Sequence, residues 1–91
     1  MTIEVTVPGL LADCTGGRRQ FPLAAVTLAD ALQRLLEEYP RLRPHLYDET
    51  MQLRRHLVVF YNDDNLATIV DRHVPLRAGD RLLVLQAVSG G

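Results

Sequence analysis

The chain has 91 residues, 47% of them hydrophobic, and its ten basic and eleven acidic residues give a formal net charge of −1. This length predicts one domain with a modest core. The near-neutral charge gives no basic footprint for nucleic acid, and no stretch approaches the roughly 20 apolar residues of a membrane span. The first residues lack the layout of a signal peptide. We therefore expect a cytoplasmic protein that binds neither nucleic acid nor membrane.

The N-terminal part predicts a β-hairpin. Apolar and polar residues alternate from Ile3 to Val7, which is the period of a strand with one buried face. A polar turn follows, in which Gly16 and Gly17 supply positive φ angles. Arg18 to Leu23 then makes the return strand.

The clearest element is an amphipathic helix that begins after Thr27. Thr27 is a good N-cap residue, and Asp30 takes the place of the glutamate of a capping box. Pro40 disfavours helical geometry at the residue before it, so the helix should end at Tyr39. Six apolar residues recur at helical spacing and form one stripe that can pack across a sheet: Leu28, Ala31, Leu32, Leu35, Leu36 and Tyr39.

Shorter elements should follow the helix. Within segment 41–48, Leu42 and Leu46 are spaced for a short helical turn that covers one end of the sheet, and Pro44 limits its length. The unbroken apolar run from Leu57 to Tyr61 predicts an interior strand.

The C-terminal part completes the predicted sheet. Asn62 to Asn65 is a turn cluster, and Leu66 to Val70 is expected to be a short strand. A turn at 78–80 leads into the final strand, Arg81 to Val88. This order predicts an α+β fold with one main helix on a mixed sheet of four to five strands. A final strand that runs centrally and parallel to the first gives the ubiquitin-like β-grasp topology.

The last three residues, Ser89, Gly90 and Gly91, carry no bulky side chain. We expect residues 1–88 to form the domain and residues 89–91 to be a flexible tail. From Gln86 to Gly91 an extended chain reaches roughly 20 Å, at about 3.3–3.6 Å per residue, so it can enter another protein's active site. A terminal carboxyl, with a typical pKa of about 3.3–3.7, is ionised at neutral pH and needs no base to act as a nucleophile. The alternative is a frayed end without a function.

Other chemically active residues give weaker signals. His45, His56 and His73 do not have the spacing of a metal site on a helix. The single cysteine, Cys14, excludes an internal disulfide and is expected to be a loop thiol. The pair Asp63-Asp64 lies in an Asn-rich turn, where carboxylates ordinarily bond to the backbone. We predict no catalytic residue and no metal ligand.

Arg54 and Arg55 beside His56 allow two interpretations. They can form a patch that faces a partner protein. They can also be the solvated entrance to the strand that begins at Leu57, which is the interpretation that we favour.

Several motifs in this order resemble the ThiS/MoaD family of ubiquitin-like sulfur carriers, and most of all its longer CysO type. The resemblance covers nearly the whole chain. It is carried by Val5-Thr6-Val7-Pro8-Gly9-Leu10-Leu11, Thr15-Gly16-Gly17, Thr27-Leu28 with Leu35 and Tyr39, Leu53-Arg54-Arg55, Tyr61-Asn62-Asp63-Asp64, Ala78-Gly79-Asp80 and the final Ala87-Val88-Ser89-Gly90-Gly91.

The resemblance implies a role for the tail. An E1-like adenylating enzyme would activate the carboxylate of Gly91 with ATP, and a persulfide would convert it to a thiocarboxylate. Gly90 and Ser89 would let the tail thread into the enzyme. The partner surface would include Leu83, Leu85 and Val88 of the final strand.

The resemblance also implies the partners. The acceptor would be a cysteine synthase-like enzyme that uses pyridoxal phosphate or, as the next choice, the large subunit of molybdopterin synthase. A metalloprotease would release the product in the cysteine route. ATP and pyridoxal phosphate would act in partner enzymes, so the chain itself would bind no cofactor and would not be an enzyme.

Two other functions fit the same sequence. The chain can be a ubiquitin-like modifier that is conjugated through Gly91 to lysines of other proteins. It can also be a non-covalent β-grasp interaction module with an incidental tail.

Overall fold

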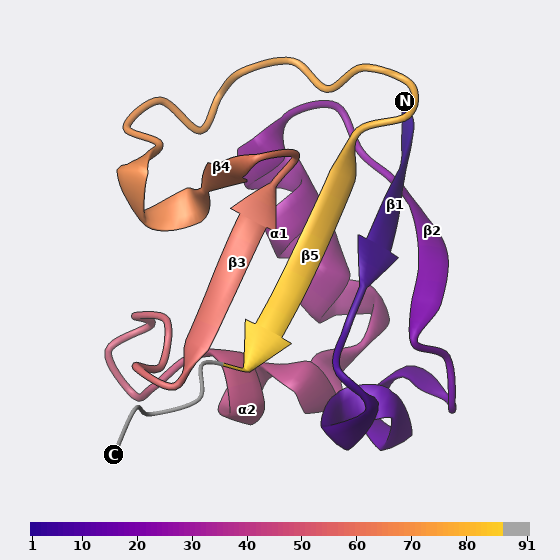
Figure 1. Ribbon diagram of the computed structural model, residues 1–91, viewed down its shortest axis with the longest axis vertical. Helices are drawn as coiled ribbons and strands as arrows, with labels where there is room; N and C mark the ends of the chain where they lie inside the picture. The colour runs from indigo at the N-terminus through magenta and orange to yellow at the C-terminus, as the bar shows by residue number, and fades with distance from the viewer. Residues whose placement is uncertain (87–91) are drawn as a thin grey trace.

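Five strands form one mixed sheet in the computed structural model, which describes residues 1–86 (Figure 1). The sheet order is β2-β1-β5-β3-β4. The predicted domain boundary at Val88 and the tail residues Ser89, Gly90 and Gly91 lie outside the described residues. The strands are β1 (Thr2–Thr6), β2 (Gln20–Ala24), β3 (Leu57–Tyr61), β4 (Asp64–Asn65) and β5 (Arg81–Gln86), and the helices are α1 (Leu28–Glu38), α2 (Arg43–Leu46) and the 3-10 helices η1 (Gly9–Thr15), η2 (Pro40–Leu42) and η3 (Leu66–Thr68).

The predicted N-terminal hairpin is confirmed. β1 and β2 pair antiparallel from Thr2 opposite Ala24 to Thr6 opposite Gln20. Gly16 and Gly17 have φ angles of 67° and 86°, the left-handed region that glycine adopts without strain. The sequence did not indicate η1, which fills the connection between the strands and buries Leu11.

The central helix begins and ends close to where the sequence predicts. The Thr27 hydroxyl accepts a hydrogen bond of 3.1 Å from the backbone amide of Asp30, and the Asp30 carboxylate accepts one of 2.9 Å from the amide of Val26. This arrangement satisfies two amides that no helical carbonyl can reach. The helix stops at Glu38, one residue before Tyr39.

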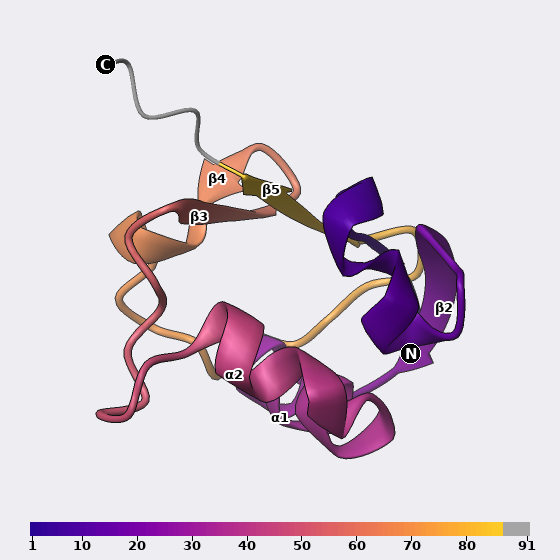
Figure 2. The same ribbon diagram turned by 90° about the horizontal axis from the view of Figure 1, so that it is seen from below.

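The turn predicted after α1 is also present. Leu42 in η2 and Leu46 in α2 are both buried, and α2 lies on the same side of the sheet as α1 (Figure 2). Pro44 is the second residue of α2. Proline is tolerated in a first helical turn because its missing amide would have no helical partner there.

The prediction of a strand from Leu66 to Val70 is wrong. Asp64 and Asn65 pair with β3 as β4, and Leu66–Thr68 turns away as η3. The side chain of Asn65 accepts a hydrogen bond of 2.9 Å from the amide of Ala67. This local bond caps the 3-10 turn and offers the backbone an alternative to sheet pairing.

The final strand has the predicted central place. β5 pairs parallel with β1 and antiparallel with β3. It therefore lies between the first and the third strand, which is the β-grasp arrangement. Because β4 contributes only two residues, β3 is paired on both of its sides only at Phe60 and Tyr61.

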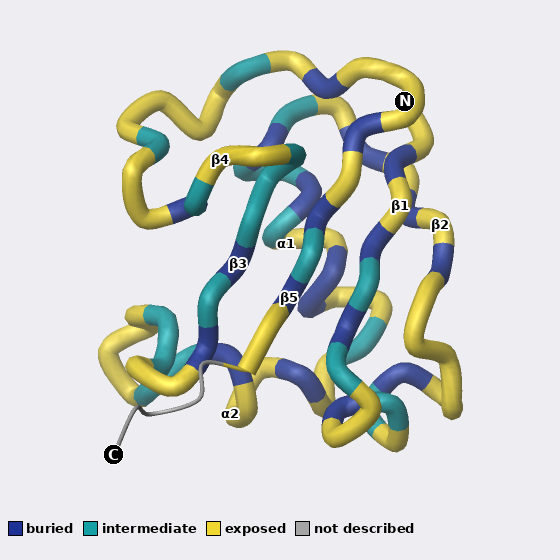
Figure 3. The backbone as a smooth tube through the Cα atoms, in the orientation of Figure 1, coloured by how far each residue is buried: buried dark blue, intermediate teal, exposed yellow. Residues whose placement is uncertain are grey.

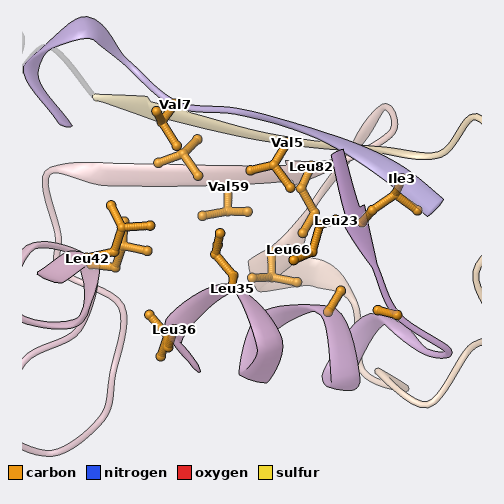
Figure 4. Close-up of a cluster of buried hydrophobic side chains, with 14 of the residues drawn as sticks. Ile3, Val5, Val7, Leu23, Leu35, Leu36, Leu42, Val59, Leu66 and Leu82 are labelled. Carbon is orange, nitrogen blue, oxygen red and sulfur yellow. The ribbon is translucent and has the colours of Figure 1, made fainter. Parts of the chain in front are cut away.

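The core lies between the sheet and α1. Ile3, Val5, Val59 and Leu82 project from the sheet toward Leu35 of the helix (Figure 4). Along β1, β2 and the first part of β5, buried residues alternate with more exposed ones, so the opposite face of the sheet looks outward (Figure 3). Within the described residues, none of the helices is long and apolar enough to cross a membrane.

Candidate functional site

The outer face of the sheet carries two of the residues that the sequence assigned to a partner surface. Leu82 and Val84 of β5 are buried, so Leu83 and Leu85 point to the opposite face, where Leu85 is 42% exposed. The third residue of that surface, Val88, lies outside the described residues, as do Ser89, Gly90 and Gly91.

The strand register extends this apolar surface onto β3. Val58 lies opposite Leu85, and Phe60 lies opposite Leu83. Because paired residues share a face of the sheet, these four side chains form one continuous surface. We call Val58, Phe60, Leu83 and Leu85 the outer-face patch. Sequence alone does not indicate Val58 and Phe60 as surface residues, because an unbroken apolar run does not show which residues face outward.

A polar surface borders the outer-face patch. Gln20 donates a hydrogen bond of 3.3 Å to Glu4, and the guanidinium of Arg81 lies 3.8 Å from the carboxylate of Asp63. These four residues and Leu83 line a hollow of about 300 Å³. An apolar centre with a polar border is typical of protein contact surfaces.

A buried carboxylate fixes the beginning of β5. Asp80 accepts hydrogen bonds from the Tyr61 hydroxyl at 2.5 Å, from the amide of Arg77 at 2.9 Å and from the side chain of Asn62 at 3.3 Å. Its backbone carbonyl accepts a bond of 3.0 Å from the amide of Glu4 in β1. β5 is therefore anchored to both of its neighbours before the outer-face patch begins.

These contacts change two pKa values. Burial alone would raise the pKa of Asp80, but the hydrogen bonds from Tyr61, Arg77 and Asn62 lower it below its usual range. Burial, together with the hydrogen bond to Asp80 and the charge of that carboxylate, raises the pKa of Tyr61 to about 12. Asp80 is therefore ionised and Tyr61 is neutral at pH 7.

A second hollow, of about 200 Å³, lies at the end of β5 from which the tail continues. We call it the tail-end hollow. Residues from four separate parts of the chain line it: Pro8, Leu10, Leu11, Pro44, His45, Arg54, His56, Leu57 and Gln86. It brings His45 and His56 together, although nothing in their spacing along the chain associates them. Only the tertiary fold joins these segments, so no spacing signal could have revealed the hollow.

The remaining candidates do not join this region. His73 is exposed in the loop before β5, and Cys14 is a half-buried free thiol in η1. Asp63 is exposed and contacts Arg81. Within residues 1–86, no three His, Cys, Asp or Glu side chains are grouped so that they could hold a metal ion.

Known proteins share both the sequence pattern and the fold. The model of the ThiS family matches residues 5–91. The sulfur carrier protein CysO of Mycobacterium tuberculosis is 26% identical over 93 residues, with full coverage of both chains. The crystal structure of SAMP1 from Haloferax volcanii has a TM-score of 0.75 at 26% identity and full coverage of both chains. The crystal structure of the Amycolatopsis orientalis BexX/CysO complex matches with a TM-score of 0.78 at 25% identity, over 98% of this chain and 99% of that chain.

Proposed function

This chain belongs to the ThiS family of ubiquitin-like proteins, and from that membership we propose that it is a sulfur carrier that acts with partner enzymes. The observation that carries the proposal is the family match, which extends to residue 91 and so includes the Gly-Gly sequence. The outer-face patch supports it, because a carrier without its own active site must be recognised by the enzymes that use it.

We propose Gly91 as the site of sulfur attachment. An oxygen of its carboxylate attacks the α-phosphate of ATP on an E1-like enzyme, which gives an acyl-adenylate and releases pyrophosphate. The terminal sulfur of a persulfide then attacks the acyl carbon and displaces AMP. A second thiol cleaves the resulting acyl disulfide, so that a thiocarboxylate leaves with Gly91 and a disulfide remains on the donor.

The tail and the outer-face patch have separate roles in this scheme. Ser89 and Gly90 let the last residues thread into a narrow active site, because small residues neither widen the chain nor restrict its dihedral angles. Leu83, Leu85 and Val88 belong to the surface that the E1-like enzyme binds. ATP binds to that enzyme and not to this chain.

We propose a cysteine-forming route as the destination of the sulfur. The likeness to CysO over the full length of both chains supports this choice. The nucleophilic thiocarboxylate would attack an electrophilic carbon in a synthase that uses pyridoxal phosphate, and a metalloprotease would then release the product. The large subunit of molybdopterin synthase is the alternative acceptor.

A second candidate function is that of a ubiquitin-like protein modifier. The likeness to SAMP1 favours it, because SAMP1 is a small archaeal modifier protein. The chemistry up to the acyl-adenylate is the same, but the final nucleophile is a lysine amine of another protein. An interaction module with an incidental tail is the third reading.

The mass of the intact chain tests these proposals. After incubation with ATP, the cognate E1-like enzyme and a sulfur donor, we expect a mass gain equal to the replacement of one oxygen by sulfur, located in the Gly91 peptide. A chain without Gly91 should gain nothing.

The alternatives give different products. Isopeptide adducts on other proteins without any thiocarboxylate would favour the modifier. An unchanged mass with a competent enzyme, and full partner binding by a chain extended beyond Gly91, would favour the interaction module.

A further inference from the structure

The tail-end hollow leads to an inference that rests on the proposed function. We propose that the hollow binds an acidic side chain of the E1-like enzyme that activates the tail. The contact would be separate from the outer-face patch and would give the enzyme a second, charge-dependent point of recognition.

The position of the hollow makes contact with that enzyme necessary. Gln86 is the last described residue of β5 and lines the hollow. An enzyme that encloses the residues after Gln86 must therefore approach this end of the molecule. Leu85, which precedes Gln86, belongs to the outer-face patch, so the two surfaces are neighbours on opposite sides of the end of β5.

The charge of the hollow selects an anionic group. Arg54, His45 and His56 line it, and no carboxylate is among its described lining residues. The Nε of Arg54 donates a hydrogen bond of 2.7 Å to the carbonyl oxygen of Pro44, which fixes the guanidinium against α2. Among residues 1–86 the four N–H groups on its terminal nitrogens make no hydrogen bond, and their planar geometry matches a carboxylate.

Asp48 and Glu49 line a neighbouring hollow together with Arg54, but within the described residues neither forms an ion pair with it. The pKa of Asp48 is lowered mainly by the side-chain hydrogen bond from Thr50, and the positive charge of Arg54 is the smallest of the contributions. One oxygen of Asp48 accepts bonds from the Thr50 amide at 2.8 Å, the Thr50 hydroxyl at 2.7 Å and the Gln52 amide at 3.0 Å. Within the described residues, no ion pair involves Arg54.

The apolar part of the lining suits the stem of an acidic side chain. Leu57 and Leu11 are buried beneath the hollow, whereas Leu10 is 71% exposed at its edge. A volume of about 200 Å³ accommodates a side chain and not a folded segment. A glutamate could lay its methylene groups on the leucines and present its carboxylate to Arg54.

A negative charge introduced at His56 tests the proposal while Arg54 itself stays in place. His56 is exposed, so His56→Glu should leave the fold intact. The matched control is His73→Glu, which makes the same change at an exposed histidine outside the hollow. For thiocarboxylate formation by the cognate E1-like enzyme, we expect His56→Glu to raise KM about tenfold or more, because like charges repel across an interface. The value of kcat should be unchanged, and His73→Glu should behave as the wild type.

A second pair of variants removes a positive charge instead of adding a negative one. Arg54→Gln should raise KM and weaken its dependence on salt, whereas Arg41→Gln, at an exposed arginine outside the hollow, should change neither. Circular dichroism checks that each variant is folded. Equal KM values for His56→Glu and His73→Glu, or a lower KM for His56→Glu, would overturn the proposal. A wild-type chain that never accepts sulfur would instead overturn the proposed function, so the two failures are distinguishable.

Discussion

At the scale of single residues, Asp80 determines how β5 begins. Its carboxylate joins Tyr61 and Asn62, at the end of β3, to the turn at Arg77. Gly79 in that turn has a φ of 89°, which lets the chain reverse just before the strand. The contacts of one side chain thus align three segments that are distant in sequence.

Replacing Tyr61 by phenylalanine should destabilise the domain. The variant loses the hydrogen bond to an ionised carboxylate, and we expect the free energy of unfolding to fall by about 1–2 kcal/mol. Urea denaturation at pH 7 measures it. Tyr39→Phe is the matched control, because within the described residues the hydroxyl of Tyr39 makes no hydrogen bond. The ring of Tyr39 packs on that of Phe21, with 4.6 Å between the ring centroids, and the variant keeps this contact.

The difference in the free energy of unfolding between the wild type and Tyr61→Phe should also depend on pH. The pKa of Asp80 is lowered in the folded state, so its contribution is present above the unfolded value of about 3.9 and is lost as the pH falls through the folded value. The pKa of Tyr61 is raised to about 12, so its contribution is present below the unfolded value of about 10 and is lost as the pH rises through 12. A difference that stays constant across both ranges would contradict this account.

At the scale of elements, α1 depends on the cap at Thr27. Thr27→Ala removes the acceptor for the Asp30 amide, and we expect a loss of about 1 kcal/mol in the free energy of unfolding. Thr27→Ser keeps the hydroxyl and should restore most of that stability. Thermal and urea denaturation of the three proteins give the comparison, and equal stability of the alanine variant and the wild type would exclude a role for the cap.

The outer-face patch should act in binding and not in folding. Leu85→Asp introduces a charge at a position that is 42% exposed, so its stability should stay within about 0.5 kcal/mol of the wild type. Its affinity for the E1-like enzyme should fall at least about tenfold, since a buried unpaired charge is costly at an interface. Val70→Asp is the control, because Val70 is 98% exposed and lies outside the patch. Calorimetric titration that finds equal affinities for the two variants would remove the patch from the interface.

The sequence predicted those elements whose signals are local. The α1 stripe, its cap and the glycine turn of the hairpin each depend on residues within one or two turns of each other, and each is confirmed. The apolar residues from Leu66 to Val70 predict a strand, but Leu66–Thr68 forms a 3-10 turn, in which the side chain of Asn65 accepts a hydrogen bond from the amide of Ala67. The outward residues of β3 and the tail-end hollow depend on register and on contacts between distant segments, which no local pattern records.

At the scale of the whole molecule, two surfaces meet where β5 ends. Helices α1 and α2 lie on one side of the sheet (Figure 2), and the outer-face patch lies on the other. The tail-end hollow is at the edge between them, lined by residues of the α2 side and of β5. A partner that holds the residues after Gln86 can contact both surfaces at once, so mutations in either should add approximately in free energy if the surfaces are independent.

The place of β5 between β1 and β3 also has a mechanical consequence. A partner that draws on the residues after Gln86 pulls along the axis of β5. The hydrogen bonds to β3 run across that axis, and those to β1 hold the opposite edge, so the load is shared by both sets of bonds in shear. A hairpin peeled from its tip opens one bond at a time, whereas a strand held in this way yields only when many bonds break together. The domain can therefore serve as a firm anchor while an enzyme keeps the tail under tension.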